Sequence, residues 1–278
     1  MEPRTQSAVP EPVQGRFRRR RRRRERRARS RGFYLLPHLV TTAGLFFGFY
    51  AIVQAFTGHP DRAALGIVLA GVCDALDGRL ARMAHSASRF GLEFDSIADI
   101  VSFGVAPAVL AYSAGGLDEL GRTGLVMAFL YVAGAALRLA RFNVTPSRYR
   151  GRFEGMPSPA AAGMVASTQW FVAFLAEHGI VLEVPAPLVA IAAAGLGLLM
   201  VSSIPYRSFK ELDLRHSYGT LVIVVFTVAL VIQEPSLTLF AIALAYALSG
   251  PVEWLWRWFT RRPLEEIHEP LVQEPAQG

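Results

Sequence analysis

The chain has 278 residues, of which 52% are hydrophobic and only 18% charged, with a formal net charge of +7. A soluble protein would alternate apolar and polar positions along its helices, whereas several runs here are apolar on every side and approach the roughly 20 residues that span a bilayer. Composition therefore excludes an ordinary soluble domain and predicts an all-α, polytopic membrane protein.

The basic charge is concentrated in an arm that precedes the first apolar run. Twelve arginines and one glutamate lie between residues 16 and 31, so the rest of the chain carries a small net negative charge. Such a run repels itself, and we expect residues 1–32 to be disordered, to stay in the cytoplasm and to bind anionic membrane lipids. Nucleic acid is a disfavoured partner because no aromatic or folded reading element accompanies the arginines.

Apolar runs predict eight spans, all within one integral membrane catalytic domain that covers residues 33–260. A short acidic tail over residues 261–278 follows, and we expect it to be disordered. The last two expected spans are separated by very few residues and could instead form one broken hairpin. The expected spans cover residues 35–56, 63–82, 92–114, 124–142, 159–177, 187–204, 218–233 and 236–256.

The loop charges predict the orientation of these spans. Arginines gather in the loops at 79–91, 143–157 and 205–217, whereas the opposite loops hold few cations and several acids. By the positive-inside rule the arginine-containing loops and both termini are cytoplasmic. In a bacterial cell the corresponding membrane is the inner membrane.

Four aspartates lie at the cytoplasmic ends of the second and third expected spans. Asp74 and Asp77 are three residues apart on one helix, and Asp95 and Asp99 are four apart on the next, so each pair faces one direction. A short loop brings the pairs together, and hard oxygen donors suit Mg²⁺ or Mn²⁺, which also retain waters and substrate phosphates as ligands. Because ionisable groups in membrane helices usually mark function, the cluster predicts an ion site.

Small and polar residues beside the aspartates predict a place for a phosphate-bearing ligand. Gly78 and Ala81 remove side-chain bulk, Arg82 can neutralise a phosphate, and Ser88 in the loop can donate to one. Each also has a structural explanation, since small residues favour helix packing and an arginine at a cytoplasmic helix end obeys the topology rule. Their combination with the four aspartates favours the ligand site.

The spacing D-x2-D-G-x2-A-R-x8-G-x3-D-x3-D resembles the signature of the CDP-alcohol phosphatidyltransferase family. The similarity runs from about Tyr34 to Lys210 and implies a six-helix core, to which this chain adds two C-terminal helices. The positions that match the signature are Asp74, Asp77, Gly78, Ala81, Arg82, Gly91, Asp95 and Asp99.

The resemblance also implies a site with two metal ions, Mg²⁺ or Mn²⁺, at the cytoplasmic interface. One ion is expected on Asp74, Asp77 and Asp95, and the other on Asp74, Asp95 and Asp99. Asp99 is in addition the expected catalytic base. The expected contacts of the CDP-diacylglycerol head group are Gly78, Arg82 and Ser88.

The downstream segments DIVSFGVAPA, ALRLARFNV, FEGMPSPAAAG and LMVSSIPYRSFK resemble the branch of the family that uses L-serine. The implied activity is transfer of the phosphatidyl group from CDP-diacylglycerol to the serine hydroxyl, giving phosphatidylserine and CMP. This branch commonly reads Pro-Asn before a threonine, whereas this chain has Pro37, His38 and then Thr41. We therefore assign no nucleotide contact to His38.

The acceptor imposes two further requirements on the site. A serine hydroxyl is a poor nucleophile at neutral pH and needs a positioned base, for which Asp99 is the best candidate. The serine carboxylate needs cations or convergent donors, and Arg138, Arg141 and Asn143 at the end of the fourth expected span can supply them. The alternative is that both arginines only enforce topology.

Two other functions are compatible with the pattern. A sibling phosphatidyltransferase would use glycerol 3-phosphate or an inositol phosphate, but the neutral polar run 102–107 does not supply the extra cations that a phosphorylated acceptor requires. A divalent-cation transporter would also place carboxylates in membrane helices, although here all four lie at one interface and not at mid-membrane. The oligomeric state is not determined by the sequence, and a homodimer is compatible with it.

Overall fold

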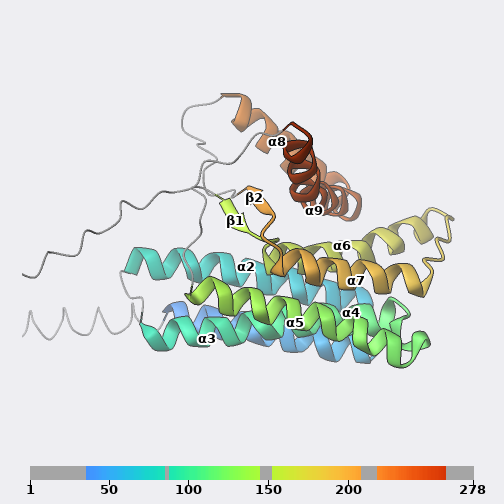
Figure 1. Cartoon of the computed structure of the whole chain (residues 1–278), viewed down its shortest axis with the longest axis horizontal. Coiled ribbons are helices and arrows are strands. Elements are labelled where there is room, and N and C mark those ends of the chain that lie inside the picture. The colour runs from blue at the N-terminus through green and yellow to red at the C-terminus, as the bar shows by residue number, and fades with distance from the viewer. Residues whose placement is uncertain (1–35, 85–87, 145–151, 208–217, 261–278) are drawn as a thin grey trace, which may run out of the picture.

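The computed structural model describes residues 36–84, 88–144, 152–207 and 218–260, whose helices are shown in Figure 1. The expected all-α fold is confirmed, because each predicted apolar run forms a helix close to its expected bounds. The arginine-rich arm and the acidic tail lie outside the described residues. The helical segments are Leu36–Phe56, α2 (Pro60–Ala84), α3 (Arg89–Asp99), η1 (Ile100–Val105), α4 (Ala106–Ala114), η2 (Leu117–Leu120), α5 (Arg122–Val144), α6 (Ser158–Glu177), α7 (Ala186–Val201), α8 (Tyr218–Gln233) and α9 (Pro235–Thr260).

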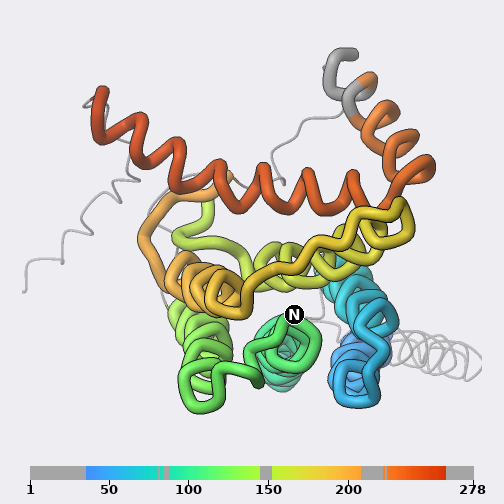
Figure 2. Tube along the Cα trace, turned by 90° about the vertical axis from the view of Figure 1, so that its right-hand side faces the viewer, coloured from blue at the N-terminus to red at the C-terminus, as the bar shows by residue number. Residues whose placement is uncertain are grey.

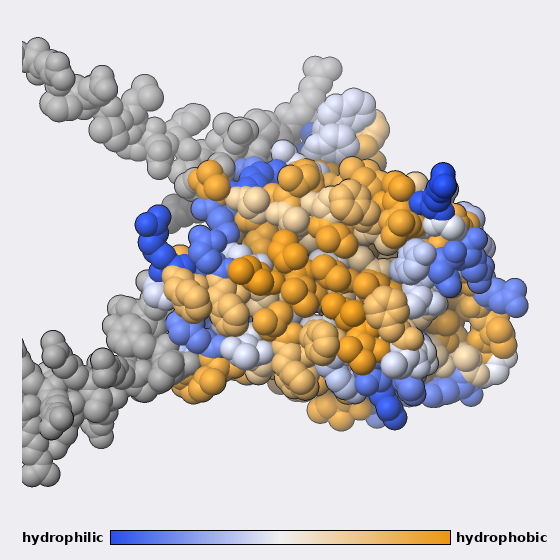
Figure 3. Space-filling view, turned by 90° about the horizontal axis from the view of Figure 1, so that it is seen from below, coloured by the Kyte–Doolittle hydropathy of each residue, from blue (hydrophilic) through white to orange (hydrophobic). Residues whose placement is uncertain are grey.

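The outer surface of the bundle is that of a membrane protein. Five helices in the described ranges are long and apolar enough to cross a bilayer, and two shorter helices are also apolar. Figure 3 shows a broad apolar band on one side of the bundle, with hydrophilic residues gathered at both ends. The helix α2 is not among the five, because its second half carries the charged residues Asp74, Asp77, Arg79 and Arg82.

The third span is continuous but changes its winding beside the aspartates. The α-helix α3 ends at Asp99, the six residues of η1 form a π-helix, and α4 continues the span. Pro107, near the start of α4, has no N–H with which to bond the carbonyl one turn earlier. The Tyr131 hydroxyl of α5 donates instead to the Phe103 carbonyl at 3.2 Å, so this buried acceptor is satisfied. Such π segments often occur at functional sites.

Small residues let the helices pack closely. The first helix, α2, α4 and α6 share one apolar cluster that is rich in alanine, and α4, α5, α6, α7 and α9 contribute to a second. At the crossing of α5 and α7, a Cβ added to Gly197 would lie 2.6 Å from the Leu130 carbonyl oxygen, and one added to Gly134 would overlap the Gly197 backbone. Only glycine permits this approach, which fixes how α5 is placed against α7.

Two features of the C-terminal part were not predicted from the sequence. Strands β1 (Arg152–Glu154) and β2 (Pro205–Arg207) form a short antiparallel pair with Arg152 opposite Arg207. In addition, α9 does not run alongside the bundle helices but crosses them steeply while it packs on α6, as the two views in Figures 1 and 2 agree. The β pair lies between the bundle and α9 (Figure 1).

Candidate functional site

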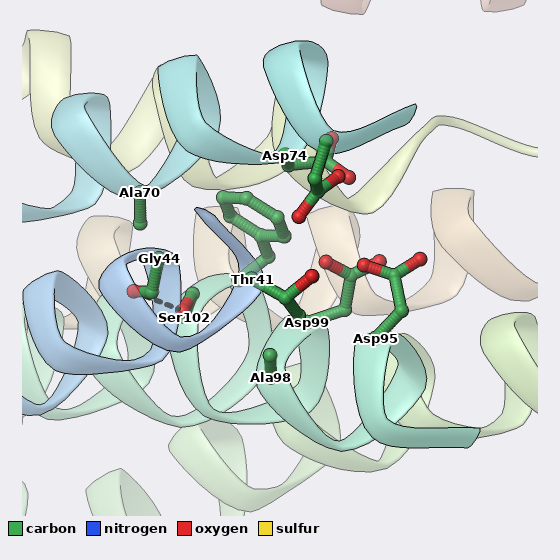
Figure 4. A pocket seen from close by; sticks show the side chains of 10 residues that line it. Thr41, Gly44, Ala70, Asp74, Asp95, Ala98, Asp99 and Ser102 are labelled. Carbon is green, nitrogen blue, oxygen red and sulfur yellow. Dashed lines mark hydrogen bonds between the residues drawn. The ribbon is translucent and has the colours of Figure 1, made fainter. Parts of the chain in front are cut away.

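The two aspartate pairs, one on α2 and one on α3, line the same pocket. Carboxylate oxygens of Asp74, Asp95 and Asp99, one from each residue, all lie within 4.8 Å of one another, and the three residues are half-buried. Figure 4 shows the Asp74 carboxylate pointing from α2 toward those of Asp95 and Asp99 on α3. Three converging carboxylate oxygens fit a divalent cation of the Mg²⁺ or Mn²⁺ type, and without a cation their mutual repulsion would be costly.

Asp77 lines the same pocket but lies deeper than its neighbours. Its side chain is only 5% exposed, and Thr41 of the first helix lines the same pocket, where its hydroxyl donates to the Pro37 carbonyl at 3.0 Å. Asp74 and Asp95 are its charged neighbours, so it lies at the margin of the three-carboxylate group. The sequence analysis missed Thr41, although the residue stands in the segment that was compared with the family pattern.

The first helix holds the π segment that follows Asp99. The Ser102 hydroxyl donates to the Gly44 carbonyl oxygen at 3.2 Å, and a Cβ added to Gly48 would lie 2.8 Å from the Cα of Ser102. These close contacts join the first helix to the segment directly after Asp99. The position of the Asp99 carboxylate is therefore set by the first helix as well as by α3.

The residues expected to contact the phosphate-bearing ligand are not among those that line the aspartate pocket. A Cβ added to Gly78 would meet no neighbouring atom of the described chain within 4 Å, so space is open beside Asp77. The Arg82 side chain is exposed. The Ser88 hydroxyl caps α3 by accepting a hydrogen bond from the Gly91 N–H at 3.0 Å, while the side chain of Ala81 lies outside the described residues.

Arg138 is a buried arginine of α5 that is bonded to α6. It is only 8% exposed, its Nη1 donates to the Ser158 hydroxyl at 3.1 Å, and Asp99 is the carboxylate that attracts it. Its Nε is buried and has no hydrogen-bond partner among the described residues. Buried donors are almost always paired, so this Nε is an exception in the packing around α5. Sequence reasoning quoted the segment that contains Ser158 but gave this serine no role.

Arg141 and Asn143 are placed differently from Arg138. The Arg141 guanidinium donates to three backbone carbonyls, those of Val201 at 2.9 Å, Glu154 at 2.7 Å and Ser202 at 3.1 Å. It thereby fastens α5 to β1 and to the end of α7. The Asn143 amide donates to the Ser96 hydroxyl at 2.9 Å, on the turn of α3 next to Asp95. The structure thus bonds Arg138 to Ser158 of α6 and uses Arg141 to join segments of the backbone.

Comparison with known proteins agrees with this arrangement. A family model described as CDP-alcohol phosphatidyltransferase matches residues 34–199, which include every residue of the pocket. The chain is 35% identical to the CDP-diacylglycerol–serine O-phosphatidyltransferase of Helicobacter pylori over 239 residues, or 80% of this chain and 92% of the relative. Proteins of the same name from Mycobacterium leprae (32% identical; 82% of this chain, 78% of the relative) and Bacillus subtilis (36%; 63% and 92%) are also similar.

Proposed function

This chain belongs to the CDP-alcohol phosphatidyltransferase family, and from that membership we propose that it makes phosphatidylserine and CMP from CDP-diacylglycerol and L-serine. The observation that carries the proposal is the convergence of Asp74, Asp95 and Asp99 in a chain that covers 92% of a relative named for this reaction. The name of the relative indicates serine as the acceptor, and the aspartates provide the groups needed to cleave the diphosphate.

The donor set of the site fits divalent cations. We assign one ion to Asp74, Asp77 and Asp95 and a second to Asp74, Asp95 and Asp99, and we expect Mg²⁺ or Mn²⁺ because the ligands are all carboxylate oxygens. When bound, these ions would neutralise the diphosphate and stabilise the charge that develops on the departing CMP. Thr41 of the first helix lines the pocket together with these carboxylates.

Asp99 is the group that we assign to accept the proton of the serine hydroxyl. As the hydroxyl oxygen forms its bond to phosphorus, the bond from phosphorus to the CMP oxygen breaks, CMP leaves with the bonding electrons, and the proton passes to the Asp99 carboxylate. Half-burial restricts water around Asp99, and the contacts of Ser102 with the first helix hold its backbone in place. A base that is held in place next to the reacting phosphorus lowers the entropic part of the activation barrier.

The serine carboxylate is assigned to Arg138. This guanidinium is buried, has Asp99 as an electrostatic neighbour and has an Nε without a partner among the described residues, whereas three carbonyls occupy Arg141. A single buried guanidinium suits an acceptor with one carboxylate. Asn143 contributes indirectly by holding Ser96, which lies between the two metal-binding aspartates of α3.

The CDP-diacylglycerol head group is assigned to the open side of the cluster. Gly78 leaves space there for a diphosphate, and Ala81, Arg82 and Ser88 complete the contacts implied by the family pattern. The excess of arginine in the loops on this side supports a cytoplasmic active site. The proposed binding of anionic lipids concerns the arginine-rich arm, which is outside the described residues.

A panel of acceptors tests the proposal. Full-length protein, purified in detergent with Mg²⁺ or Mn²⁺, is given CDP-diacylglycerol and labelled L-serine, glycerol 3-phosphate or inositol phosphate in turn, and both CMP and the lipid product are measured. We expect labelled phosphatidylserine and CMP with serine only. A product formed only from glycerol 3-phosphate or inositol phosphate would contradict the serine assignment.

A further inference from the structure

The π segment η1 begins directly after Asp99 and ends next to the start of α4. The Ala106 N–H bonds to the Val101 carbonyl five residues earlier, which is the hydrogen-bond pattern of π winding. Pro107 follows and has no N–H to donate to the Phe103 carbonyl, as a regular α-helix would require. The winding of the third span is therefore wider in the turn after Asp99 than in α3.

Tyr131 of α5 binds this segment from one side. Its side chain is buried, and its hydroxyl donates at 3.2 Å to the Phe103 carbonyl, the group to which Pro107 cannot donate. A Cβ added to Gly104 would lie 3.4 Å from the Cβ of Ala135, so the next turn of α5 also packs directly on the segment. The hydrogen bond and the close packing hold η1 against α5.

The first helix binds the same segment from another side. The Ser102 hydroxyl donates to the Gly44 carbonyl at 3.2 Å, and a Cβ added to Gly48 would lie 2.8 Å from the Cα of Ser102. A side chain larger than hydrogen at position 48 would therefore push the segment away. The π segment is thus held between two helices that carry none of the four aspartates.

The residues that are held in this way line the aspartate pocket. Ser102 and Phe103 stand three and four residues after Asp99, and all three belong to the lining. The carboxylate oxygens of Asp74, Asp95 and Asp99 lie within 4.8 Å of one another. Because reactive groups must be held to within about 0.5 Å, a small rotation of the last turn of α3 would disturb this arrangement.

We propose that Tyr131 is a positioning residue for Asp99 and that it acts through the π segment together with Ser102. Holding this segment fixes the rotation of the last turn of α3 and keeps the Asp99 carboxylate beside those of Asp74 and Asp95. The inference rests on the proposed function, in which Asp99 binds a divalent cation and accepts the serine proton. We assign neither hydroxyl a contact with substrate, since each donates to a backbone carbonyl.

A pair of tyrosine variants compares two buried hydroxyl groups with the same kind of partner. Tyr131→Phe removes the bond to the Phe103 carbonyl, and Tyr206→Phe removes a bond of 3.0 Å from another buried tyrosine to the Ala247 carbonyl. Tyr206 belongs to β2, which contributes no residue to the aspartate pocket. The two changes should therefore cost similar stability, but only the first should disturb Asp99.

A pair of serine variants repeats the comparison on the side of the first helix. Ser102→Ala removes the bond to the Gly44 carbonyl, whereas Ser167→Ala removes a bond of the same length, 3.2 Å, to the Met164 carbonyl within α6. Both serines are buried, and Ser167 does not line the aspartate pocket. Ser167→Ala is therefore the control for the loss of a buried serine hydroxyl.

Each full-length variant is purified and measured in two ways. Mn²⁺ binding without substrates is followed by the electron paramagnetic resonance signal of the free ion, and kcat and the KM for serine are measured at saturating Mn²⁺ and CDP-diacylglycerol. We expect Tyr131→Phe and Ser102→Ala to bind Mn²⁺ on the order of three- to tenfold more weakly, the size of one lost hydrogen bond. Their kcat should fall on the order of tenfold, because a displacement of about 1 Å can cost a hundredfold. The KM for serine, and both properties of the two controls, should stay close to the parent.

The effect should also depend on the Asp99 carboxylate. In an Asp99→Asn background, Tyr131→Phe should lower kcat no further, since residues that act through one another are not additive. The inference is overturned if Tyr131→Phe binds Mn²⁺ and turns over like the parent, if Tyr206→Phe loses as much as Tyr131→Phe, or if the full effect persists in the Asp99→Asn background.

Two arms of the experiment keep the inference separate from folding and from the identity of the acceptor. If Tyr131→Phe does not fold, Ser102→Ala and its control Ser167→Ala decide the question by the same criteria. A parent protein that makes lipid from glycerol 3-phosphate and not from serine would contradict the proposed function alone, because the Mn²⁺ comparison involves no acceptor.

Discussion

Replacing Arg138 by alanine is the most informative perturbation of the acceptor site. The side chain is 8% exposed and donates to Ser158 at 3.1 Å, so it is already oriented before the substrate binds. A charge-assisted hydrogen bond contributes about 1.5–3 kcal/mol, and tenfold in binding corresponds to about 1.4 kcal/mol. We therefore expect the KM for serine to rise on the order of ten- to hundredfold, with little change in the KM for CDP-diacylglycerol.

The assay compares Arg138→Ala with Arg141→Ala in the same detergent and with the same metal. Since Arg141 binds three backbone carbonyls, its loss should lower the thermal unfolding temperature much more than it raises the KM for serine. The Arg138 assignment is refuted if the folded Arg138→Ala protein uses serine as well as the parent does. In that case the serine carboxylate binds elsewhere and Arg138 has only a structural role.

Three further predictions concern the aspartates and the helix packing. Asp99→Asn should lower kcat by about 10²- to 10⁴-fold, the usual contribution of a general base, and retain CDP-diacylglycerol in an equilibrium binding assay; near-parent turnover would exclude Asp99 as the base. Asp74→Asn should raise the Mg²⁺ or Mn²⁺ concentration needed for half-maximal activity, and an unchanged metal titration would remove Asp74 from the proposed metal site. Gly134→Ala should lower thermal stability by about 1–3 kcal/mol because α5 and α7 must separate, whereas Gly195→Ala, which has open space around it, should not; equal melting of the two variants would contradict the packing argument.

The helices could be predicted because membrane-spanning helices need long apolar runs, which are visible in the sequence. The β pair could not, because strands of three residues such as Arg152–Glu154 have no readable periodicity and depend on a partner far along the chain. The direction of α9 could not be predicted either, because Gly250 and Glu253 contact residues of β1 and β2 that are far away in the sequence.

The convergence of the aspartates could also be predicted, because helical spacing places Asp95 and Asp99 on one face and a short loop brings them to Asp74. The difference between Arg138 and Arg141 could not, since the two stand three residues apart with the same charge. What separates them is distant in sequence: Ser158 lies beside one guanidinium, and the Val201 and Ser202 carbonyls lie beside the other. The place of Thr41 in the pocket beside Asp77 depends in the same way on how the first helix packs.

The central claim is best tested by the stoichiometry of one reaction. Purified full-length protein is incubated with CDP-diacylglycerol and labelled L-serine, and phosphatidylserine and CMP are quantified over time with a divalent cation and after its removal by a chelator. The account predicts one CMP for each phosphatidylserine, loss of both products on chelation and recovery when Mg²⁺ or Mn²⁺ is restored. Phosphatidylserine formation that continues without a divalent cation, or CMP release without labelled lipid, would contradict it.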